Sequence, residues 1–322
     1  MLAATCVSQS ASEPLSGLVV GERPDPTVPD GWTTVRLRTA ALNHHDVWSL
    51  RGVGLPSDRL PMVLGCDGAG VDADGKEVLV HAVISSPGWA GDETLDPRRS
   101  LLSEVYDGTL AEVVAVPARN LVAKPVELSW EHAACLPTAW LTAYRMLFTN
   151  ADVQPGATVL VQGAAGGVAT ALVQLGSAAG LRMWVTSRDE GRGEQAVSLG
   201  ADQWFPSGAR LPDRVDAVME TVGAATWSHS VNSLRPGGTI VISGATSGDA
   251  PARAELTKIF FKQLRVIGST MGTRDELERL SRFVVDAGIE PLVDSVVPLV
   301  DAREGFEAMV AGRVTGKVVF TI

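Results

Sequence analysis

A glycine-rich turn between an apolar run and a helical segment constrains the fold of this chain more than any other feature. Residues 158–180 read TVLVQGAAGGVATALVQLGSAAG, a strand pattern, a turn and a helix pattern in succession. Gly166 and Gly167 leave space for a pyrophosphate, and Ala169 takes the third small position, where the helix packs on the strand. We therefore predict a dinucleotide-binding loop. The alternative is a glycine-rich turn with a purely structural role.

The start of the helix is the expected pyrophosphate site. Gly166, Gly167 and Val168 stand where unpaired backbone N–H groups and the positive end of the helix dipole favour an anion. This is the reason why the turn points to a phosphorylated ligand despite a net chain charge of −10.

The residues after the next strand predict which cofactor is bound. An NAD-binding chain places an acidic residue about 20 positions after the loop. Here Arg188 stands 19 positions after Ala169. A guanidinium at that place suits the 2′-phosphate of NADPH, with Ser187 and Arg192 as further donors. The alternative is that Arg188 is a solvated loop charge and that Asp189 binds the ribose of NADH, which we consider the less favoured cofactor.

From Ser129 onward, short apolar strands alternate with helical patterns, which predicts an α/β fold with a doubly wound parallel sheet. The expected strands are Thr158–Gln162, Met183–Ser187, Ala217–Glu220, Thr239–Ser243 and Arg265–Gly268. The expected helices are Trp130–Asn150, with Ser129 as its N-cap, Val168–Ala179 and Gly193–Leu199.

The two ends of the chain have a different character. Residues 1–120 contain short strand patterns such as Val35–Leu42 and Lys76–Ile84, punctuated by Pro and Gly, which predicts an irregular β-rich domain. After residue 273, helices are expected near 274–287 and 301–311, before a last strand, Lys317–Ile322, that returns to the first domain. A length of 322 residues is compatible with two such domains.

Composition excludes several classes of partner. The acidic balance argues against nucleic-acid binding, and no apolar run reaches the ~18 residues of a membrane helix. Cys6, Cys66 and Cys135 are odd in number and scattered, which favours a reducing compartment over a disulfide framework. The N-terminus lacks the basic region of a signal peptide, so a cytoplasmic location is expected.

Four motifs in order resemble landmarks of the medium-chain dehydrogenase/reductase superfamily: NHHDVW at 43–48, PMVLGCDGAGV at 61–71, GAAGGVA at 163–169 and GKVVF at 316–320. The resemblance implies a GroES-like domain of residues 1–125 plus 268–322 and a Rossmann domain of residues 126–267, with the active site between them. It also implies a homo-oligomer, a dimer or tetramer, commonly joined through the edge strand that is here Arg265–Gly268.

The positions that hold catalytic zinc in relatives are altered. By motif they are Asn43, Cys66 and Thr138, and catalytic zinc needs three protein ligands. Residues 86–106 also contain no cysteine for the structural zinc. We therefore expect no metal, and a small buried Cys66. A different site made by His44, His45 and Asp67 is the alternative, although strand alternation would point the two histidines to opposite faces.

Similarity to the zinc-free members implies an NADPH-dependent enzyme that transfers hydride to a small-molecule quinone or α,β-unsaturated carbonyl. Two alternatives remain: a zinc-free alcohol or aldehyde dehydrogenase-like enzyme, and a non-catalytic NADPH-binding sensor or structural protein. The phosphate loop does not separate these readings, because all of them require it.

The resemblance also assigns further residues. It places around the nicotinamide and its ribose Thr142, Gly244, Ala245, Thr270 and Met271. Lys317 is expected near the phosphates or the domain junction, with a surface charge as the alternative. Asn43 is expected to orient nicotinamide or substrate, and Asp46 to hold the backbone. Trp48, where many quinone reductases have a tyrosine, either shapes the substrate site or is a core aromatic. The isolated histidines are read as structural or surface groups: His81, His132 and His229.

Overall fold

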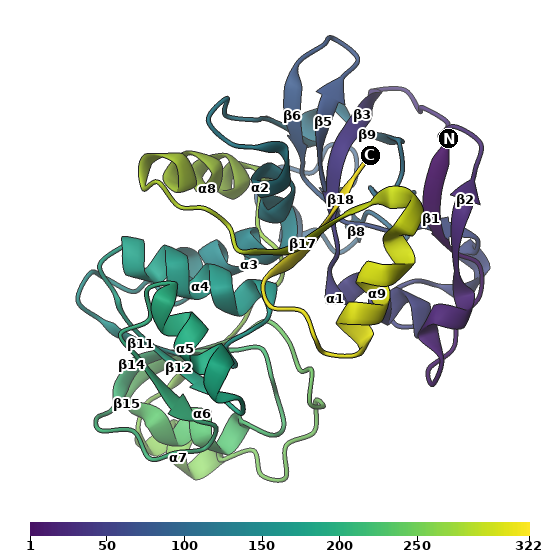
Figure 1. Ribbon diagram of the computed structural model, residues 1–322. Coiled ribbons are helices and arrows are strands. Elements are labelled where there is room, and N and C mark those ends of the chain that lie inside the picture. The colour runs from purple at the N-terminus through teal and green to yellow at the C-terminus, as the bar shows by residue number, and fades with distance from the viewer. The chain divides into compact units, whose positions relative to one another are not determined.

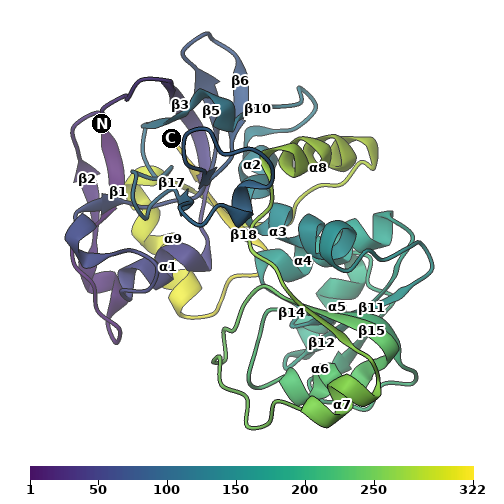
Figure 2. The ribbon, with the colours of Figure 1, turned by 180° about the vertical axis from the view of Figure 1, so that it is seen from behind.

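The computed structural model describes residues 1–322 and contains two compact units (Figures 1 and 2). Unit 1 consists of Met1–Leu141 and Met271–Ile322, and unit 2 of Thr142–Thr270. None of the helices is both long and apolar enough to cross a bilayer. The three cysteines are buried and carry free thiols.

Unit 1 is built on β-strands. Its strands are β1 Leu2–Cys6, β2 Leu18–Glu22, β3 Trp32–Ala41, β4 Met62–Val63, β5 Asp67–Asp72, β6 Glu77–Val80, β7 Val83–Ile84, β8 Ser100–Leu101, β9 Val113–Pro117, β10 Leu121–Ala123, β17 Val293–Pro298 and β18 Lys317–Thr321. Its helices are α1 His44–Leu50, α2 Trp130–Cys135, α8 Arg274–Asp286 and α9 Ala302–Val310. Its short turns of helix are η1 Pro14–Gly17, η2 Ser57–Arg59, η3 Glu93–Leu95, η4 Ala118–Asn120, η5 Leu136–Trp140 and η7 Leu299–Asp301.

The main sheet of unit 1 joins the two ends of the chain. Its order is β10-β6-β5-β3-β18-β17, and β9 pairs with β3 as well. The last strand, β18, lies antiparallel to β3, with Phe320 opposite Ala40. Phe320 stacks on Phe306 of α9 in the apolar core. The expected return of the C-terminal strand to the first domain is therefore confirmed.

Two local predictions for this unit are wrong. The expected strand Lys76–Ile84 is divided into β6 and β7, and His81, which lies between them, has its ring nitrogen Nε2 at 2.9 Å from the carbonyl oxygen of Gly272. His44 and His45 lie at the start of helix α1, where strand alternation does not apply. A capping box between Asn43 and Asp46 begins this helix.

Unit 2 is a parallel six-stranded sheet with helices. Its strands are β11 Thr158–Gln162, β12 Arg182–Ser187, β13 Gln203–Pro206, β14 Val215–Glu220, β15 Leu234–Ile242 and β16 Arg265–Gly268. Its helices are η6 Arg145–Asn150, α4 Gly167–Ala178, α5 Glu190–Ser198, α6 Trp227–Ser233 and α7 Leu256–Phe261, while α3 Leu141–Tyr144 spans the boundary of the two units.

The strand order β13-β12-β11-β14-β15-β16 gives this sheet its doubly wound form. The chain runs outward in both directions from the centre, so right-handed crossovers place α4 and α5 on one face and α6 and α7 on the other (Figure 1). Every residue of β11 is buried, as a central parallel strand requires. All five strands predicted for this region are present, and β11 and β16 have the predicted bounds.

The predicted continuous helix Trp130–Asn150 is wrong in detail. Its start is confirmed, since the Ser129 hydroxyl accepts a hydrogen bond from the His132 N–H. Beyond that, the segment alternates between α-helix and the π-helical turns η5 and η6. Pro137 accounts for the first change, because it has no N–H for an α-helical bond. The segment to Leu141 belongs to unit 1, where α2 packs on β3 and β5, so residues 126–141 lie outside the unit where they were expected.

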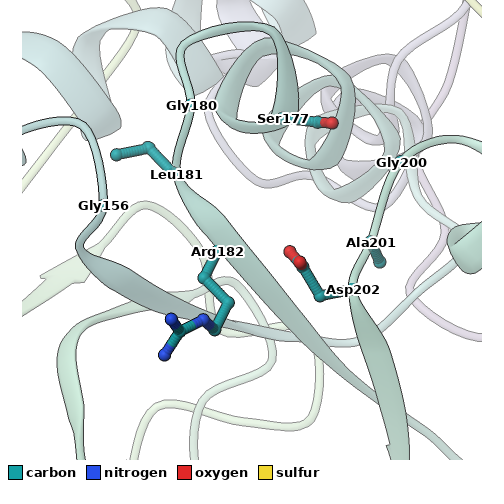
Figure 3. A pocket seen from close by; sticks show the side chains of 8 residues that line it. All are labelled: Gly156, Ser177, Gly180, Leu181, Arg182, Gly200, Ala201 and Asp202. Atoms are coloured by element: carbon teal, nitrogen blue, oxygen red, sulfur yellow. The ribbon is translucent and has the colours of Figure 1, made fainter.

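An open pocket of about 460 Å3 lies at the amino ends of the parallel strands (Figure 3). It is lined by Gly156, Ser177, Gly180, Leu181, Arg182, Gly200, Ala201 and Asp202. These residues precede β11 and β13, precede or begin β12, or lie near the end of α4. Ligands of such sheets bind at the opposite, carboxyl edge, and the glycine-rich turn after β11 lies there.

Candidate functional site

The glycine-rich turn of unit 2 has the form that a dinucleotide needs. Gly163 has a φ of +86°, which favours glycine. Gly166 is the N-cap of α4, and it has no side chain to cap the N–H groups of the first helical turn. A Cβ built on Gly166 would meet no protein atom within 4 Å. The protein itself therefore leaves open the space where the pyrophosphate of a dinucleotide would lie, and the residues present fit such a group.

The end of β12 presents the residues expected to select the cofactor. Arg188 is exposed, whereas Ser187 is buried, and the Ser187 hydroxyl bonds both the N–H and the carbonyl of Asp189. The Asp189 carboxylate accepts the Arg192 N–H at 2.9 Å and thereby caps α5. Arg188 and Asp189 are both exposed at the carboxyl end of β12, and Asp189 caps α5 through one of its two carboxylate oxygens.

The other cofactor residues of the prediction divide between the two units. Gly244 and Ala245 follow β15 and Thr270 follows β16, so they lie at the same carboxyl edge as the glycine-rich turn. Thr142 belongs to unit 2 and is buried. Met271 belongs to unit 1, has a φ of +51° and packs in an apolar cluster of that unit.

His81 holds the backbone beside Met271. Its Nε2 lies 2.9 Å from the carbonyl oxygen of Gly272, and the ring is 1% exposed. Burial lowers the pKa of His81 to about 4. His81 is therefore neutral and donates its Nε2–H to that carbonyl, and its interpretation as a structural histidine is consistent with this bond.

This buried histidine predicts a loss of stability in acid. An unfolded histidine has a pKa near 6.5, so below that value the unfolded state takes up the proton first and unfolding becomes easier as the pH falls to about 4. The full difference is about 3 kcal/mol. We expect the free energy of unfolding of the unmodified protein, measured by urea denaturation, to fall by about 3 kcal/mol more between pH 6.5 and pH 4 than that of His81→Gln. The glutamine amide can still donate to the Gly272 carbonyl but does not titrate. Equal losses would contradict the assignment.

In unit 1, Asn43, Asp67 and Lys317 form a buried polar cluster. The Lys317 ammonium donates to Asn43 Oδ1 at 2.7 Å, Asp67 Oδ2 at 2.7 Å and the Leu42 carbonyl oxygen at 2.8 Å. Asn43 Nδ2 donates to Asp67 Oδ2 at 2.8 Å. The two charged partners settle the orientation of the Asn43 amide, because its oxygen must face the ammonium and its nitrogen the carboxylate.

The position of Lys317 narrows its possible roles. Its side chain is 3% exposed, so the alternative of a surface charge is wrong. Its three ammonium protons are matched by three acceptors, so a contact with a cofactor phosphate would require this set to open.

Asp46 secures the backbone beside this cluster. Its carboxylate accepts the N–H groups of Asn43 and Gly65, each at 2.9 Å. These two bonds are consistent with the expected role of Asp46 in holding the backbone. Complete burial raises the pKa of Asp46 to about 7, against the opposing effects of the two N–H groups and Lys317.

Helix α1 also presents Trp48 and His45. Trp48 is half-buried, with the Arg51 guanidinium 5.1 Å from its ring centroid, so it is not a core aromatic. His45 Nε2 lies 3.9 Å from Glu104 Oε1 and has no hydrogen-bond partner. Burial lowers the pKa of His45 and the Glu104 charge opposes this.

The donor set of unit 1 does not fit catalytic zinc. Cys66 donates its thiol hydrogen to the Leu102 carbonyl oxygen, and burial raises its pKa. Asn43 is held by Lys317 and Asp67, and Thr138 offers only a hydroxyl. No three His, Cys, Asp or Glu side chains are grouped to hold a metal ion, which includes His44, His45 and Asp67.

Sequence reasoning missed two features at these positions. The pairing of Lys317 with Asp67 joins residues 250 positions apart, although a lysine at the start of an otherwise apolar strand was a signal of a buried charge. In unit 2, Glu220 is fully buried at the end of β14. An acidic residue closing the apolar run of that strand was the corresponding signal.

Two family models match the chain. The model of the alcohol dehydrogenase GroES-like domain matches residues 29–126, and the model described as zinc-binding dehydrogenase matches residues 167–286. They confirm the predicted fold, a GroES-like β-rich domain combined with a Rossmann-type parallel sheet.

Several relatives match nearly the whole chain. An acryloyl-coenzyme A reductase of Metallosphaera sedula is 30% identical over 325 residues, covering 95% of this chain and 96% of that protein. A zinc-type alcohol dehydrogenase-like protein of Schizosaccharomyces pombe is 30% identical over 316 residues and 91% of each chain. The solved structure of an NAD-dependent alcohol dehydrogenase has a TM-score of 0.92 at 35% identity, with 100% of both chains covered. The chain therefore belongs to the medium-chain dehydrogenase/reductase superfamily, a group of oxidoreductases.

Proposed function

We propose that this chain is an NADPH-dependent reductase of α,β-unsaturated carbonyl compounds that works without catalytic zinc. The observation that carries the proposal is that Asn43, one of the three positions that hold zinc in relatives, is instead bound in a buried cluster with Asp67 and Lys317, in a chain with an intact dinucleotide turn. The name of the acryloyl-coenzyme A reductase relative supports a conjugated carbonyl over a quinone.

The cofactor would be held along the carboxyl edge of the unit 2 sheet. Gly166, Gly167 and Val168 would hold the pyrophosphate, and Arg188 with Arg192 the 2′-phosphate. Ser187 would shape that turn, because its hydroxyl already bonds Asp189. The nicotinamide end is assigned to Thr142, Gly244, Ala245, Thr270 and Met271. When bound, reduced nicotinamide supplies the hydride for the reaction.

A conjugated acceptor suits a site that offers hydrogen bonds in place of a metal. Reduction at carbon leaves negative charge on the carbonyl oxygen, where an oriented N–H group stabilises it. Asn43 is the candidate donor in unit 1. One of its amide hydrogens is bound by Asp67, and the other has only a contact of 3.5 Å with the Ala41 carbonyl oxygen. Lys317 keeps that amide oriented, and Asp46 fixes the turn that carries it.

Trp48 completes the assignment of unit 1. Its half-buried ring beside Arg51 offers a flat surface, which suits a planar conjugated substrate. The ring has no acidic hydroxyl, so the role assigned to Trp48 is shape and not proton transfer.

The decisive experiment is cofactor titration followed by turnover on one sample. Eight tryptophans provide a fluorescence signal for NADPH and NADH binding. We expect tighter binding of NADPH, and its oxidation by crotonyl-coenzyme A or a simple enone. Arg188→Ala should weaken NADPH binding by roughly 10- to 100-fold and leave NADH binding unchanged, since charge-assisted hydrogen bonds contribute about 1.5–3 kcal/mol.

Arg182→Ala is the matched control, because Arg182 is an exposed arginine at the opposite end of the same strand. Tighter binding of NADH by the unmodified chain, as the name of the solved relative suggests, would contradict the assignment of Arg188. Turnover of 1,4-benzoquinone alone would move the substrate class to quinones, and turnover of aldehydes to the dehydrogenase alternative. Binding without turnover on any acceptor would favour a sensor.

We also propose a homo-oligomer joined at the free edge of the unit 2 sheet. The edge strand β16 pairs only with β15 and exposes Val266. The neighbouring helix α7 exposes Leu256, Phe260 and Phe261 at 66% or more. Apolar side chains beside an unpaired strand edge favour association with a second copy, which sedimentation velocity would detect.

A further inference from the structure

A series of buried, hydrogen-bonded polar side chains crosses the carboxyl edge of the unit 2 sheet. Gln162, Thr186 and Glu220 lie at or next to the ends of β11, β12 and β14, and Ser230 lies in α6. Each of the four is at most 1% exposed. Polar groups this deep need hydrogen-bond partners. The bonds among these four side chains connect three strands whose following turns form the proposed cofactor site.

The hydrogen bonds that join these four side chains all run in one direction, from Thr186 to Glu220. Thr186 Oγ1 donates to Gln162 Oε1 at 2.7 Å, and Gln162 Nε2 donates to Ser230 Oγ at 2.9 Å. Ser230 Oγ then donates to Glu220 Oε2 at 2.6 Å. An ionised carboxylate only accepts, so it fixes the direction of every bond before it. The orientation of the Gln162 amide follows from this order.

The Thr186 end of this series of hydrogen bonds reaches the glycine-rich turn itself. The N–H of Gly163, the first residue after β11, points at Thr186 Oγ1 at 3.3 Å. Thr186 also lies two positions before Arg188, which is assigned to the 2′-phosphate. The Thr186 hydroxyl therefore links two turns. It lies on β12, just before the turn assigned to the 2′-phosphate, and it accepts the N–H of Gly163 in the turn assigned to the pyrophosphate.

The other end holds the turn after β14. Glu220 Oε1 accepts the N–H groups of Val222 at 2.8 Å and Gly223 at 2.9 Å, and the Thr226 hydroxyl at 2.9 Å. The turn is thus wrapped around the carboxylate. A buried charge costs free energy to desolvate, and here these oriented donors offset that cost by fixing the backbone.

The turn after β14 in turn supports the loop assigned to the nicotinamide. The Ala224 N–H donates to the Gly248 carbonyl oxygen at 2.9 Å, and the Ser247 N–H donates to the Val222 carbonyl oxygen at 2.7 Å. A Cβ on Gly223 would lie 2.8 Å from the Cα of Ala245. The loop after β15 therefore rests directly on the turn that Glu220 holds.

We propose that Gln162, Thr186, Ser230 and Glu220 are positioning residues for the dinucleotide. They set the turns after β11, β12 and β14 relative to one another without touching the cofactor. The assignment rests on the proposed function, because it presumes a dinucleotide at this edge. Its physical basis is that a binding site keeps its affinity only when its turns are held to within about 0.5 Å.

Thr186→Val tests this assignment with little change in volume. Valine removes both the donor to Gln162 and the acceptor for the Gly163 N–H. We expect the dissociation constant of NADPH to rise about tenfold, the equivalent of one net hydrogen bond. It is measured by tryptophan fluorescence far below the melting temperature. Thr186→Ser restores the hydroxyl and should stay within about twofold of the unmodified chain. Ser230→Ala breaks the next bond and serves if the valine variant does not fold.

A control variant on β14, the strand that ends in Glu220, separates an effect on cofactor positioning from an effect on general stability. Asp216 lies at the amino end of β14, where its carboxylate accepts the Thr158 N–H and pairs with Arg235. Asp216→Asn should lower the melting temperature and leave the dissociation constant unchanged. If Thr186→Val and Ser230→Ala behave like this control, the four residues are structural only and the assignment is overturned. If the unmodified chain binds neither NADPH nor NADH, the proposed function itself fails, and the assignment with it.

Discussion

Lys317→Met is expected to lower the free energy of unfolding by about 3–5 kcal/mol. Asp67 is fully buried and Lys317 is its only cation, at 2.7 Å. Removal of the ammonium leaves a buried carboxylate without compensation, and Asn43 Oδ1 and the Leu42 carbonyl oxygen lose their donor as well. Chemical denaturation followed by tryptophan fluorescence measures the difference.

Two further variants show whether the charge is responsible. Lys317→Met combined with Asp67→Asn should recover much of the loss, because the neutral amide is less costly to bury than an unpaired carboxylate. Lys76→Met removes a lysine whose ion pair with Asp74 is exposed, and it should change stability by less than about 0.5 kcal/mol. A loss in the Lys317 variant no larger than that of Lys76→Met would show that the cluster contributes nothing to stability.

The same cluster shows why part of the site could not be read from the sequence. Strand and helix patterns are local, and they predicted the parallel sheet of unit 2, including β11 and β16 with the observed bounds. The cluster depends on β18 pairing with β3, which brings Lys317 to Asn43 from 274 positions away. No local periodicity contains that information.

Local competition explains the other differences. Asn43 and Asp46 close a capping box, so the segment expected to extend the preceding strand becomes helix α1. Pro137 removes one backbone donor, so the helix expected over Trp130–Asn150 changes to the π-helical turn η5 at that point. In both cases a specific side chain outweighs the apolar pattern. The resemblance to the superfamily located the candidate residues. Only the structure shows that Lys317 is buried in a cluster with Asp67, whereas Arg188 lies on the surface.

Gly166→Asp is expected to abolish NADPH binding while leaving the fold as stable as before. Gly166 is the N-cap of α4, where aspartate is a better cap than glycine by a few tenths of a kcal/mol and also favours the helix dipole. Its φ of −68° suits any residue, and a Cβ there meets no protein atom within 4 Å. The new carboxylate would nevertheless stand where the pyrophosphate is expected and repel it. We expect affinity to fall by more than about 100-fold, or about 2.7 kcal/mol.

Gly166→Asn separates charge from bulk, because asparagine has the same size as aspartate and caps a helix equally well. Asparagine should weaken binding through its volume alone, and aspartate by about a further tenfold or more through like-charge repulsion. Fluorescence titration gives the affinities and thermal melting the stability. If both variants bind NADPH as tightly as the unmodified chain, the glycine-rich turn is structural and the pyrophosphate lies elsewhere. If both lose binding and melt at a lower temperature, Gly166 serves the fold, which would contradict the open space that the structure shows around a Cβ at this position.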